Sequence, residues 1–333
     1  MTNAPASDWR PTATLGMLKL RARMLRDIRT FFAARGVLEV ETPMLSQAAT
    51  PDPALDSFST TYTGPGAAQG DTFYLHTSPE FSMKRLLAAG SGSIYQLCKV
   101  FRNGESGRLH NPEFTMLEWY RVDYDHHQLM DEVAALVSAV LVNRLKLGPV
   151  ERLSYRDAFQ LHAGLDPHVA SHSEFLDAAR AHDIKAPTSM RDPHDLGAWR
   201  DLLLTHIVEP HLGRGQLTFL YDFPASQASL ARIHPGDPPL AARFELYVNG
   251  IELANGFHEL GDSAEQRLRF ERQLHVRETT GHRKVPLDER LLAALEAGLP
   301  DCAGVALGFD RLVMLVAGKA SLQDALGFPL DRA

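Results

Sequence analysis

Cysteine is scarce in this chain: Cys98 and Cys302 are the two cysteines among 333 residues, and both lie in apolar, strand-like surroundings. Two cysteines exclude the disulfide-rich scaffolds of small secreted proteins. Free thiols in a reducing compartment are the favoured interpretation, while a disulfide between the two is also compatible with the pattern. The N-terminal segment lacks the basic start and apolar stretch of an export signal, so we expect a cytoplasmic protein.

Long apolar runs and an excess of positive charge are also missing. No stretch of 18 apolar residues occurs, so the sequence predicts no membrane-spanning helix. The 34 Lys and Arg against 41 Asp and Glu give a net charge of −7. Proteins that bind nucleic acid over a broad surface usually carry a basic face, so this balance argues against a large tRNA interface, although it leaves local patches open. The 44% of apolar residues is typical of a globular protein.

The most informative stretch, FRNGESGRLHNPEFTMLEWY, begins at Phe101 and ends at Tyr120. It predicts the end of a strand over 94–101, a loop, and a returning strand over 114–120, because both segments are rich in apolar and aromatic residues. Strand alternation places four side chains of the second strand on one face: Phe114, Met116, Glu118 and Tyr120.

The loop between these strands has the composition of an anion-binding site. Arg102 and Arg108 flank it, and two glycines allow backbone N–H groups to approach an anion closely. Phe114 could stack on a base, with the Glu118 carboxylate on the same face. This pattern fits a nucleoside triphosphate held beside a cationic substrate. An ordinary hairpin with a solvated basic loop fits this stretch, taken alone, about equally well.

A second hairpin is predicted in RFELYVNGIELANGFHELGD, where Asn249-Gly250 is a strong two-residue turn signal. With that turn, Tyr247 faces Glu252 and Glu245 faces Ala254. The two glutamates are then diagonal neighbours with Cβ atoms roughly 7 Å apart. Such a pair suits a bridging Mg²⁺ or, equally on geometry alone, a salt-bridged surface.

Two further segments carry polar residues at helix starts. Ser78 and Pro79 suit the opening of a helix, with Glu80 in its first turn, and helix capping is their simplest role. The segment GVALGFDRLVML predicts a strand that runs into a helix capped by Asp310, with Arg311 in the first turn. The helix dipole does not favour a cation there, so this arginine is a candidate functional residue.

Histidines are frequent between residues 148 and 215, but their spacing is not typical of metal ligands, and surface positions are the expected explanation. They are His162, His168, His172, His182, His194, His206 and His211.

Three segments together resemble the signature motifs of class II aminoacyl-tRNA synthetases of the lysyl type. FFAARGVLEVETPMLS is similar to the first motif, the Phe101–Tyr120 stretch to the second, and GVALGFDRLVML to the third. The resemblance implies an α+β fold, namely a mostly antiparallel sheet flanked by helices. The first motif builds a dimer interface in that family, so we expect a homodimer.

The resemblance also implies roles for individual residues. Arg102 and Arg311 would be catalytic and hold the α- and γ-phosphates of ATP. The other expected ATP-binding residues are Asn103, Gly104, His110, Asn111, Phe114, Glu252, Leu253 and Gly308. Glu245 and Glu252 would bind Mg²⁺. The residues expected to bind the amino acid are Ser78, Pro79, Glu80, Glu118, Tyr120, Phe257, Glu259 and Ala306.

Within this class, the chain most resembles the elongation factor P (R)-β-lysine ligases. About sixteen residues precede the first motif, too few for the anticodon-binding barrel of a lysyl-tRNA synthetase. We therefore expect a short lead over 1–16 and one catalytic domain over 17–333, with an insertion of about 148–215 between the second and third motifs. The expected reaction is ATP-dependent, AMP-forming ligation of (R)-β-lysine to a lysine of elongation factor P, without tRNA. The alternatives are a freestanding enzyme that uses L-α-lysine and a non-catalytic relative.

Two positions differ from the lysyl-type pattern. Ala306 stands where lysyl-tRNA synthetases have glycine, and its methyl group could bar an α-amino group while admitting a β-amino group, a discrimination of about 1–3 kcal/mol. Gly104 stands where a glutamate is expected, so Glu105 could supply that carboxylate from the next position.

Overall fold

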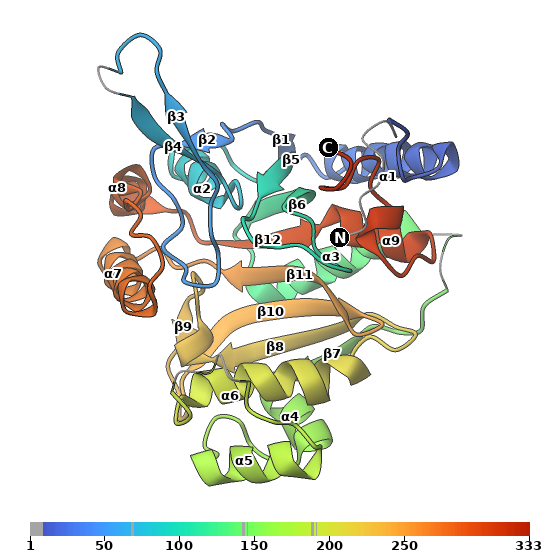
Figure 1. The fold of residues 1–333 in the computed structure, drawn as a ribbon, viewed down its shortest axis with the longest axis vertical. Helices are drawn as coiled ribbons and strands as arrows, with labels where there is room; N and C mark the ends of the chain where they lie inside the picture. The colour runs from blue at the N-terminus through green and yellow to red at the C-terminus, as the bar shows by residue number, and fades with distance from the viewer. Residues whose placement is uncertain (1–8, 68–69, 142–143, 145, 188–189, 191) are drawn as a thin grey trace.

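A nine-stranded, mostly antiparallel sheet forms the centre of the molecule (Figure 1). The computed structural model describes residues 9–333 except 68–69, 142–143, 145, 188–189 and 191. The strands follow the order β1-β5-β6-β12-β11-β10-β8-β7, with β9 beside β10, and the parallel pairs are β1/β5 and β7/β8. Their bounds are β1 Leu38–Glu39, β5 Ile94–Phe101, β6 Glu113–Val122, β7 Glu151–Ser154, β8 Thr218–Pro224, β9 Ile233–His234, β10 Leu240–Val248, β11 Ile251–His258 and β12 Cys302–Gly308.

The predicted fold class is confirmed, and both predicted hairpins lie in this sheet. Strands β5 and β6 pair in the expected antiparallel way, with Leu97 opposite Leu117. Strands β10 and β11 join through Asn249-Gly250, whose φ angles of 52° and 72° are those that a two-residue turn needs. Cys98 and Cys302 are both free thiols, as the favoured interpretation of the sequence had it.

One face of the sheet is covered by three helices, α1 (Leu15–Ala33), α3 (His126–Leu141) and α9 (Phe309–Val316). They bury the largest hydrophobic cluster, to which the sheet contributes Leu117, Trp119 and Val305. The prediction that Asp310 caps α9 is wrong. Gly308 occupies the N-cap, and the Asp310 carboxylate instead accepts hydrogen bonds from Arg21 and from the backbone N–H of Thr115.

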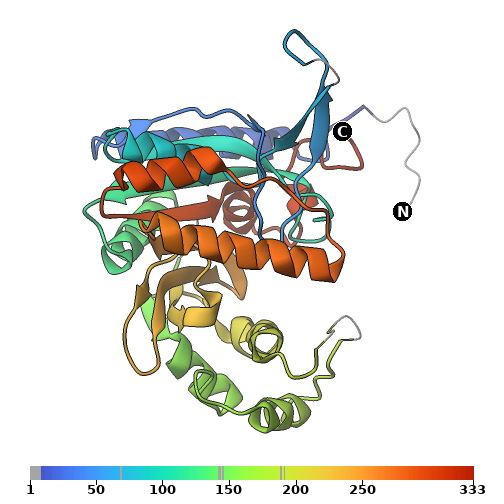
Figure 2. The same cartoon turned by 90° about the vertical axis from the view of Figure 1, so that its left-hand side faces the viewer.

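The opposite face carries a small sheet and three helices at one flank. The small sheet has the order β2-β4-β3, with bounds β2 Leu45–Ser46, β3 Ser59–Tyr62 and β4 Asp71–Leu75. The helices are α2 (Glu80–Ala88), α7 (Ser263–Thr280) and α8 (Glu289–Gly298), and Figure 2 shows α7 and α8 side by side. This layer leaves part of the sheet face open.

The segment over 148–215 packs at the far edge of the large sheet, beyond β8. It contributes β7, α4 (Tyr155–Ala163), α5 (His172–Ala181), α6 (Leu196–Leu203) and the short helices η1 (Leu204–Val208) and η2 (Glu209–His211). These helices share a hydrophobic cluster of their own with β8 and β10. Its interpretation as a family insertion stays a prediction, as does the division at residue 17, and residues 1–8 lie outside the described part. Two more short helices are η3 (Ala225–Gln227) and η4 (Leu322–Asp324).

Across the described parts of the chain, no helix combines the length and the apolarity needed to cross a bilayer.

Candidate active site

A cavity of about 550 Å³ opens on the sheet face opposite α3. Strand alternation decides which side chains reach it. On β6, the even-numbered residues from Phe114 to Tyr120 line the cavity, whereas Leu117 and Trp119 are fully buried on the other face. On β12, Gly304, Ala306 and Gly308 line the cavity. The face predicted for β6 is therefore the one that the cavity uses.

Three glutamates surround one end of the cavity, and a buried lysine stands among them. The Lys84 Nζ atom lies 2.7 Å from Glu80 Oε1 and 2.6 Å from Glu259 Oε2. Glu118, the third carboxylate, is 2% exposed, and repulsion from the charges of Glu80 and Glu259 adds to the burial that raises its pKa. With all four groups ionised, this end of the cavity carries a surplus of two negative charges.

The Glu118 carboxylate is held by two hydroxyl groups. Ser78 Oγ donates to Glu118 Oε2 at 2.6 Å, and Tyr120 Oη donates to Glu118 Oε1 at 2.7 Å. Burial raises the pKa of Glu118, and repulsion from Glu80 raises it further, while the two hydroxyl groups oppose the shift. Burial also raises the pKa of Glu259. For Lys84, burial alone would lower the pKa, but attraction to Glu259 and Glu80 outweighs it and the pKa is raised. An added cation would relieve the surplus of negative charge.

The strand register determines which side chains lie next to one another at the acidic end of the cavity. Ala306 lies opposite Glu118 on one side and opposite Asn255 on the other. Its methyl group therefore stands between an acidic residue and an amide. Two residues away on the same face, a methyl group at Gly304 would overlap the Tyr120 ring and a Glu259 oxygen. The absence of a side chain at Gly304 is what lets these two groups lie over the strand.

Two arginines mark the other end of the cavity. Arg311 Nη1 donates to the backbone carbonyl of Glu252 at 2.8 Å, and its Nη2 lies 2.9 Å from His110 Nε2. Burial and the positive charge of Arg311 lower the pKa of His110, so the neutral ring can accept this hydrogen bond. The Arg102 guanidinium lies 5.1 Å from the centre of the Phe114 ring. Two cations beside an aromatic ring suit a nucleotide with its phosphates.

The predicted register of the second hairpin is wrong by one residue beyond Tyr247. Tyr247 does face Glu252, but β11 carries an extra residue, so Glu245 faces Asn255 rather than Ala254. Both glutamates still line the cavity, and the charge of Glu252 raises the pKa of Glu245, although burial contributes more.

These carboxylates fit a divalent cation in their chemistry. Glu245 accepts hydrogen bonds from Arg243 at 2.5 Å and Tyr247 at 2.6 Å, whereas the Glu252 side chain is 39% exposed and faces the cavity. The Oδ1 atom of Asn255 is buried without a hydrogen-bond partner. Hard oxygen ligands of this kind are the ones that Mg²⁺ prefers.

Most of the predicted site residues line this cavity. Those that line it are Ser78, Glu80, Arg102, His110, Asn111, Phe114, Glu118, Tyr120, Glu245, Glu252, Leu253, Phe257, Glu259, Ala306, Gly308 and Arg311. Pro79, Asn103 and Gly104 lie just outside it: Pro79 is the N-cap of α2, the Asn103 N–H donates to Asp56, and Gly104 has a φ of 85°. Glu105 does line the cavity and lies 3.6 Å from Arg102.

Sequence reasoning missed three residues of the site. Lys84 follows Glu80 by four positions on a helix, which is a recognisable ion-pair spacing. Asn255 lies two residues before Phe257 and shares its face. Arg243 precedes Glu245 by two residues on the predicted strand, so strand alternation was the available signal.

The comparisons with known proteins agree with this geometry. The model of the family "tRNA synthetases class II (D, K and N)" matches residues 3–332. A protein of Vibrio cholerae named elongation factor P--(R)-beta-lysine ligase is 52% identical over 336 residues, which is 100% of each chain. A protein of the same name from Klebsiella pneumoniae is 52% identical over 325 residues, or 98% of each chain.

Proposed function

We propose that this chain performs the reaction for which its relatives, the elongation factor P--(R)-beta-lysine ligases, are named. The chain belongs to the class II tRNA synthetase family (D, K and N). It is an ATP-dependent ligase that activates (R)-β-lysine and transfers it to a lysine side chain of elongation factor P. The observation that carries this proposal is the buried acidic end of the cavity, where two carboxylates bind one ammonium group and the carboxylate of Glu118 adds a further negative charge.

The amino acid binds by its charges. A dicationic amino acid offsets the surplus negative charge of Glu80, Glu118 and Glu259, and burial makes each such contact stronger than it would be in water. The ring of Phe257 lines the same wall and contacts the aliphatic part of the substrate. The Asn255 amide lies opposite Ala306 in the strand register and also lines the cavity.

The first chemical step forms an acyl adenylate. A carboxylate oxygen of the amino acid attacks the α-phosphorus of ATP, an oxygen–phosphorus bond forms, and pyrophosphate leaves. Arg102 and Arg311 stabilise the negative charge that spreads over the phosphate oxygens in the transition state. Phe114 stacks on the adenine and keeps the phosphates in register with the arginines. Glu245 and Glu252 would hold Mg²⁺, which supplies charge neutralisation at the phosphates.

The second step forms an amide bond. The unprotonated amine of an acceptor lysine attacks the carbonyl carbon of the adenylate, AMP leaves, and the amine proton passes to solvent. Neither step needs a covalent protein nucleophile, because positioning and electrostatic stabilisation supply the catalysis.

The protein acceptor is favoured over tRNA by the relatives and by charge. Both relatives are aligned over at least 98% of their length and carry the same name. The net charge of −7 does not provide a broad basic surface for an RNA backbone. We also propose a cytoplasmic location, because the proposed acceptor is a translation factor and both cysteines are free thiols.

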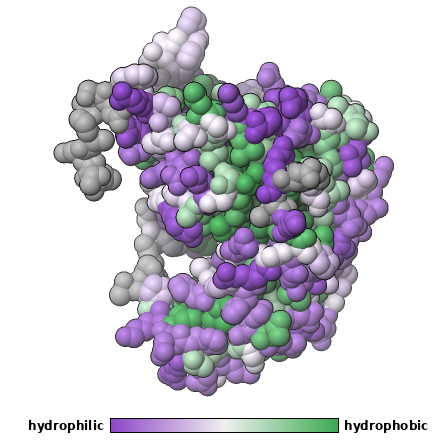
Figure 3. Space-filling model, turned by 90° about the vertical axis from the view of Figure 1, so that its right-hand side faces the viewer, coloured by the Kyte–Doolittle hydropathy of each residue, from purple (hydrophilic) through white to green (hydrophobic). Residues whose placement is uncertain are grey.

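A homodimer is proposed from the exposed apolar residues around α1, β1 and β2. Leu15, Leu38, Met44 and Leu45 are all among the exposed large hydrophobic residues. Figure 3 shows that hydrophobic surface is largest in the upper half of the face that it presents. Sedimentation of the purified chain at micromolar concentration tests this point: a dimer mass is expected, and a monomer mass contradicts it.

The acceptor is tested directly by mass spectrometry. The enzyme, ATP and (R)-β-lysine are incubated with either elongation factor P or bulk tRNA. We expect the mass of elongation factor P to rise by one β-lysyl group and the tRNA to remain uncharged. Charged tRNA together with unmodified elongation factor P would overturn the proposal.

A further inference from the structure

Four histidines gather on the sheet face that lies opposite the cavity. His126 and His127 begin α3, His234 ends β9, and His258 ends β11. His258 alternates along the chain with Phe257 and Glu259, which line the cavity, whereas His258 does not line it and lies on the other side. This cluster is therefore separate from the proposed active site.

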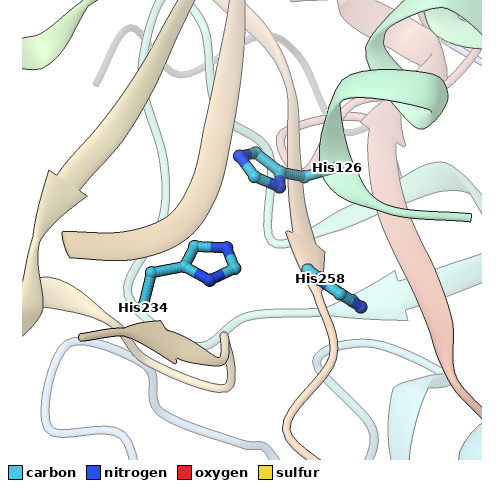
Figure 4. Close-up of side chains that lie close together, drawn as sticks. All are labelled: His126, His234 and His258. Atoms are coloured by element: carbon cyan, nitrogen blue, oxygen red, sulfur yellow. The ribbon is translucent and has the colours of Figure 1, made fainter.

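Three of these side chains lie close together (Figure 4). A ring nitrogen from each of His126, His234 and His258 lies within 4.8 Å of the other two. A hollow of about 370 Å³ adjoins them, lined also by Asp125, Asp222 and Leu240. The three residues come from elements that are far apart in the sequence, so no local spacing could reveal the group.

Hydrogen bonding leaves the nitrogens of this cluster unused. His126 is 3% exposed, and neither of its ring nitrogens has a hydrogen-bond partner. His258 is 7% exposed, and its Nδ1 is also without a partner. A buried polar atom without a partner costs about 1–3 kcal/mol, so such atoms usually have a function or a missing ligand.

Neighbouring carboxylates orient two of the rings. His258 Nε2 lies 2.9 Å from Asp301 Oδ1, which leaves Nδ1 as the free nitrogen. His126 Nε2 faces Asp222 Oδ1 at 3.5 Å without a hydrogen bond, so the carboxylate lies beside that nitrogen and both ring nitrogens remain without a partner. Histidines that bind metals characteristically use one nitrogen for the ion and the other for a carboxylate.

We propose that His126, His234 and His258 form a binding site for a divalent transition-metal ion of the Zn²⁺ class, with Asp222 and Asp301 orienting two of the ligands. Imidazole nitrogens favour Zn²⁺, Ni²⁺, Co²⁺ or Cu²⁺ over Mg²⁺ and Ca²⁺. Bonds of about 2.0–2.1 Å require the three rings to close in by small side-chain rotations. The adjoining hollow leaves space for water as a fourth ligand.

The position of this site gives it a structural consequence. A bound ion ties the start of α3 and the short β9 to the end of β11. His258 directly precedes Glu259, so the ion fixes the strand end that carries one of the carboxylates of the cavity.

Titration of the full-length, tag-free protein after treatment with a chelator tests the site. Zn²⁺ is added in competition with a chromophoric chelator, and Co²⁺ is added separately to record its visible absorption bands. We expect one tightly bound Zn²⁺ per chain and Co²⁺ bands of the intensity typical of four-coordinate nitrogen ligation.

The variants separate this site from other metal-binding groups. His234 is exposed, so His234→Ala should fold normally and should weaken Zn²⁺ binding by a factor on the order of 100 or more. Asp301→Asn should weaken it roughly 10-fold through loss of the orienting contact. His182→Ala, which removes the exposed histidine just after the end of α5, is the matched control and should bind like the unchanged protein.

A rise in the unfolding temperature with Zn²⁺ should accompany binding and should be lost in His234→Ala. Absence of a tight equivalent of Zn²⁺ in the unchanged protein would overturn the proposal. Tight binding that His234→Ala leaves as strong as in the control would overturn it too, because the ion would then lie elsewhere.

Discussion

The ammonium nitrogen of Lys84 lies 2.6 Å from a carboxylate oxygen of Glu259, and both side chains are almost completely buried. Glu80 completes the ion pair from the same helix as Lys84. A buried ion pair of this kind is costly unless its charges balance. Here Glu118 adds a further carboxylate, and the imbalance is what the proposed amino-acid substrate relieves.

Glu118→Gln should weaken binding of the amino acid. The substitution removes one negative charge but keeps an oxygen that can accept from Ser78 or Tyr120. A lost charge-assisted contact is worth about 1.5–3 kcal/mol, so we expect KM for the amino acid to rise roughly 10- to 100-fold. Initial rates of pyrophosphate release measure this.

The matched control is Glu113→Gln, an exposed carboxylate on the same strand that pairs with Lys99. It should leave KM unchanged. A similar KM for both variants would contradict the role assigned to the Glu118 charge.

Binding of the amino acid should release protons. Burial raises the pKa of Glu118 and Glu259, so part of each group is protonated in the free protein above the ordinary carboxyl value of 4.5. A bound cation favours the ionised forms and lowers these pKa values, so affinity should increase as pH rises from 5.5 to 7.

Calorimetry in two buffers of different ionisation enthalpy counts the protons. The Glu118→Gln variant should release fewer protons on binding the amino acid, because it has one titrating carboxyl group less. Net proton uptake on binding by the unchanged protein would rule out this account of the acidic end.

Arg311→Ala should abolish adenylate formation without unfolding the protein. The side chain is partly exposed to the cavity, and its hydrogen bonds go to the backbone carbonyls of Leu109 and Glu252 and to the His110 ring. Loss of a charge that stabilises the transition state costs roughly 10²- to 10³-fold in kcat. Pyrophosphate release and thermal unfolding are measured together.

Arg267→Ala is the control for Arg311→Ala, because Arg267 makes an exposed ion pair with Glu289 on the outer helices. It should retain full activity. Normal pyrophosphate release by Arg311→Ala would remove the role proposed for this arginine.

Ala306→Gly should improve the use of L-α-lysine. The Ala306 methyl group lies between Glu118 and Asn255 in the strand register, where an α-amino group would need space. A single methyl group discriminates by about 1–3 kcal/mol, so the ratio of kcat/KM for the two isomers should shift by roughly 10- to 100-fold. An unchanged ratio would show that another feature sets selectivity.

The sequence predicted most of the sheet because its strands and turns are encoded locally. Asn249-Gly250 fixed one hairpin, and alternation along β6 gave the correct face for Glu118. The register error at Glu245 arose from a bulge at Leu253, an extra residue in β11 that the turn sequence does not indicate. The sequence predicted that Asp310 caps a helix, but its carboxylate accepts a hydrogen bond from Arg21, which is 289 residues away in the sequence.

The site was predicted where motif residues are themselves the ligands, and missed where folding supplies the contact. Lys84 and Arg243 belong to the site because of the carboxylates that they bind, and the sequence alone does not show which carboxylate a buried cation pairs with. The histidine cluster is the extreme case. Spacing gave no signal for it, because its members come from a helix and two strands that only the fold brings together.

The most direct test of the account is pyrophosphate release from ATP without any acceptor, with (R)-β-lysine and L-α-lysine in separate reactions. The account predicts rapid release with (R)-β-lysine and much slower release with L-α-lysine. Activity confined to L-α-lysine would contradict it, since the cavity would then serve a lysyl-type synthetase and not a β-lysine ligase.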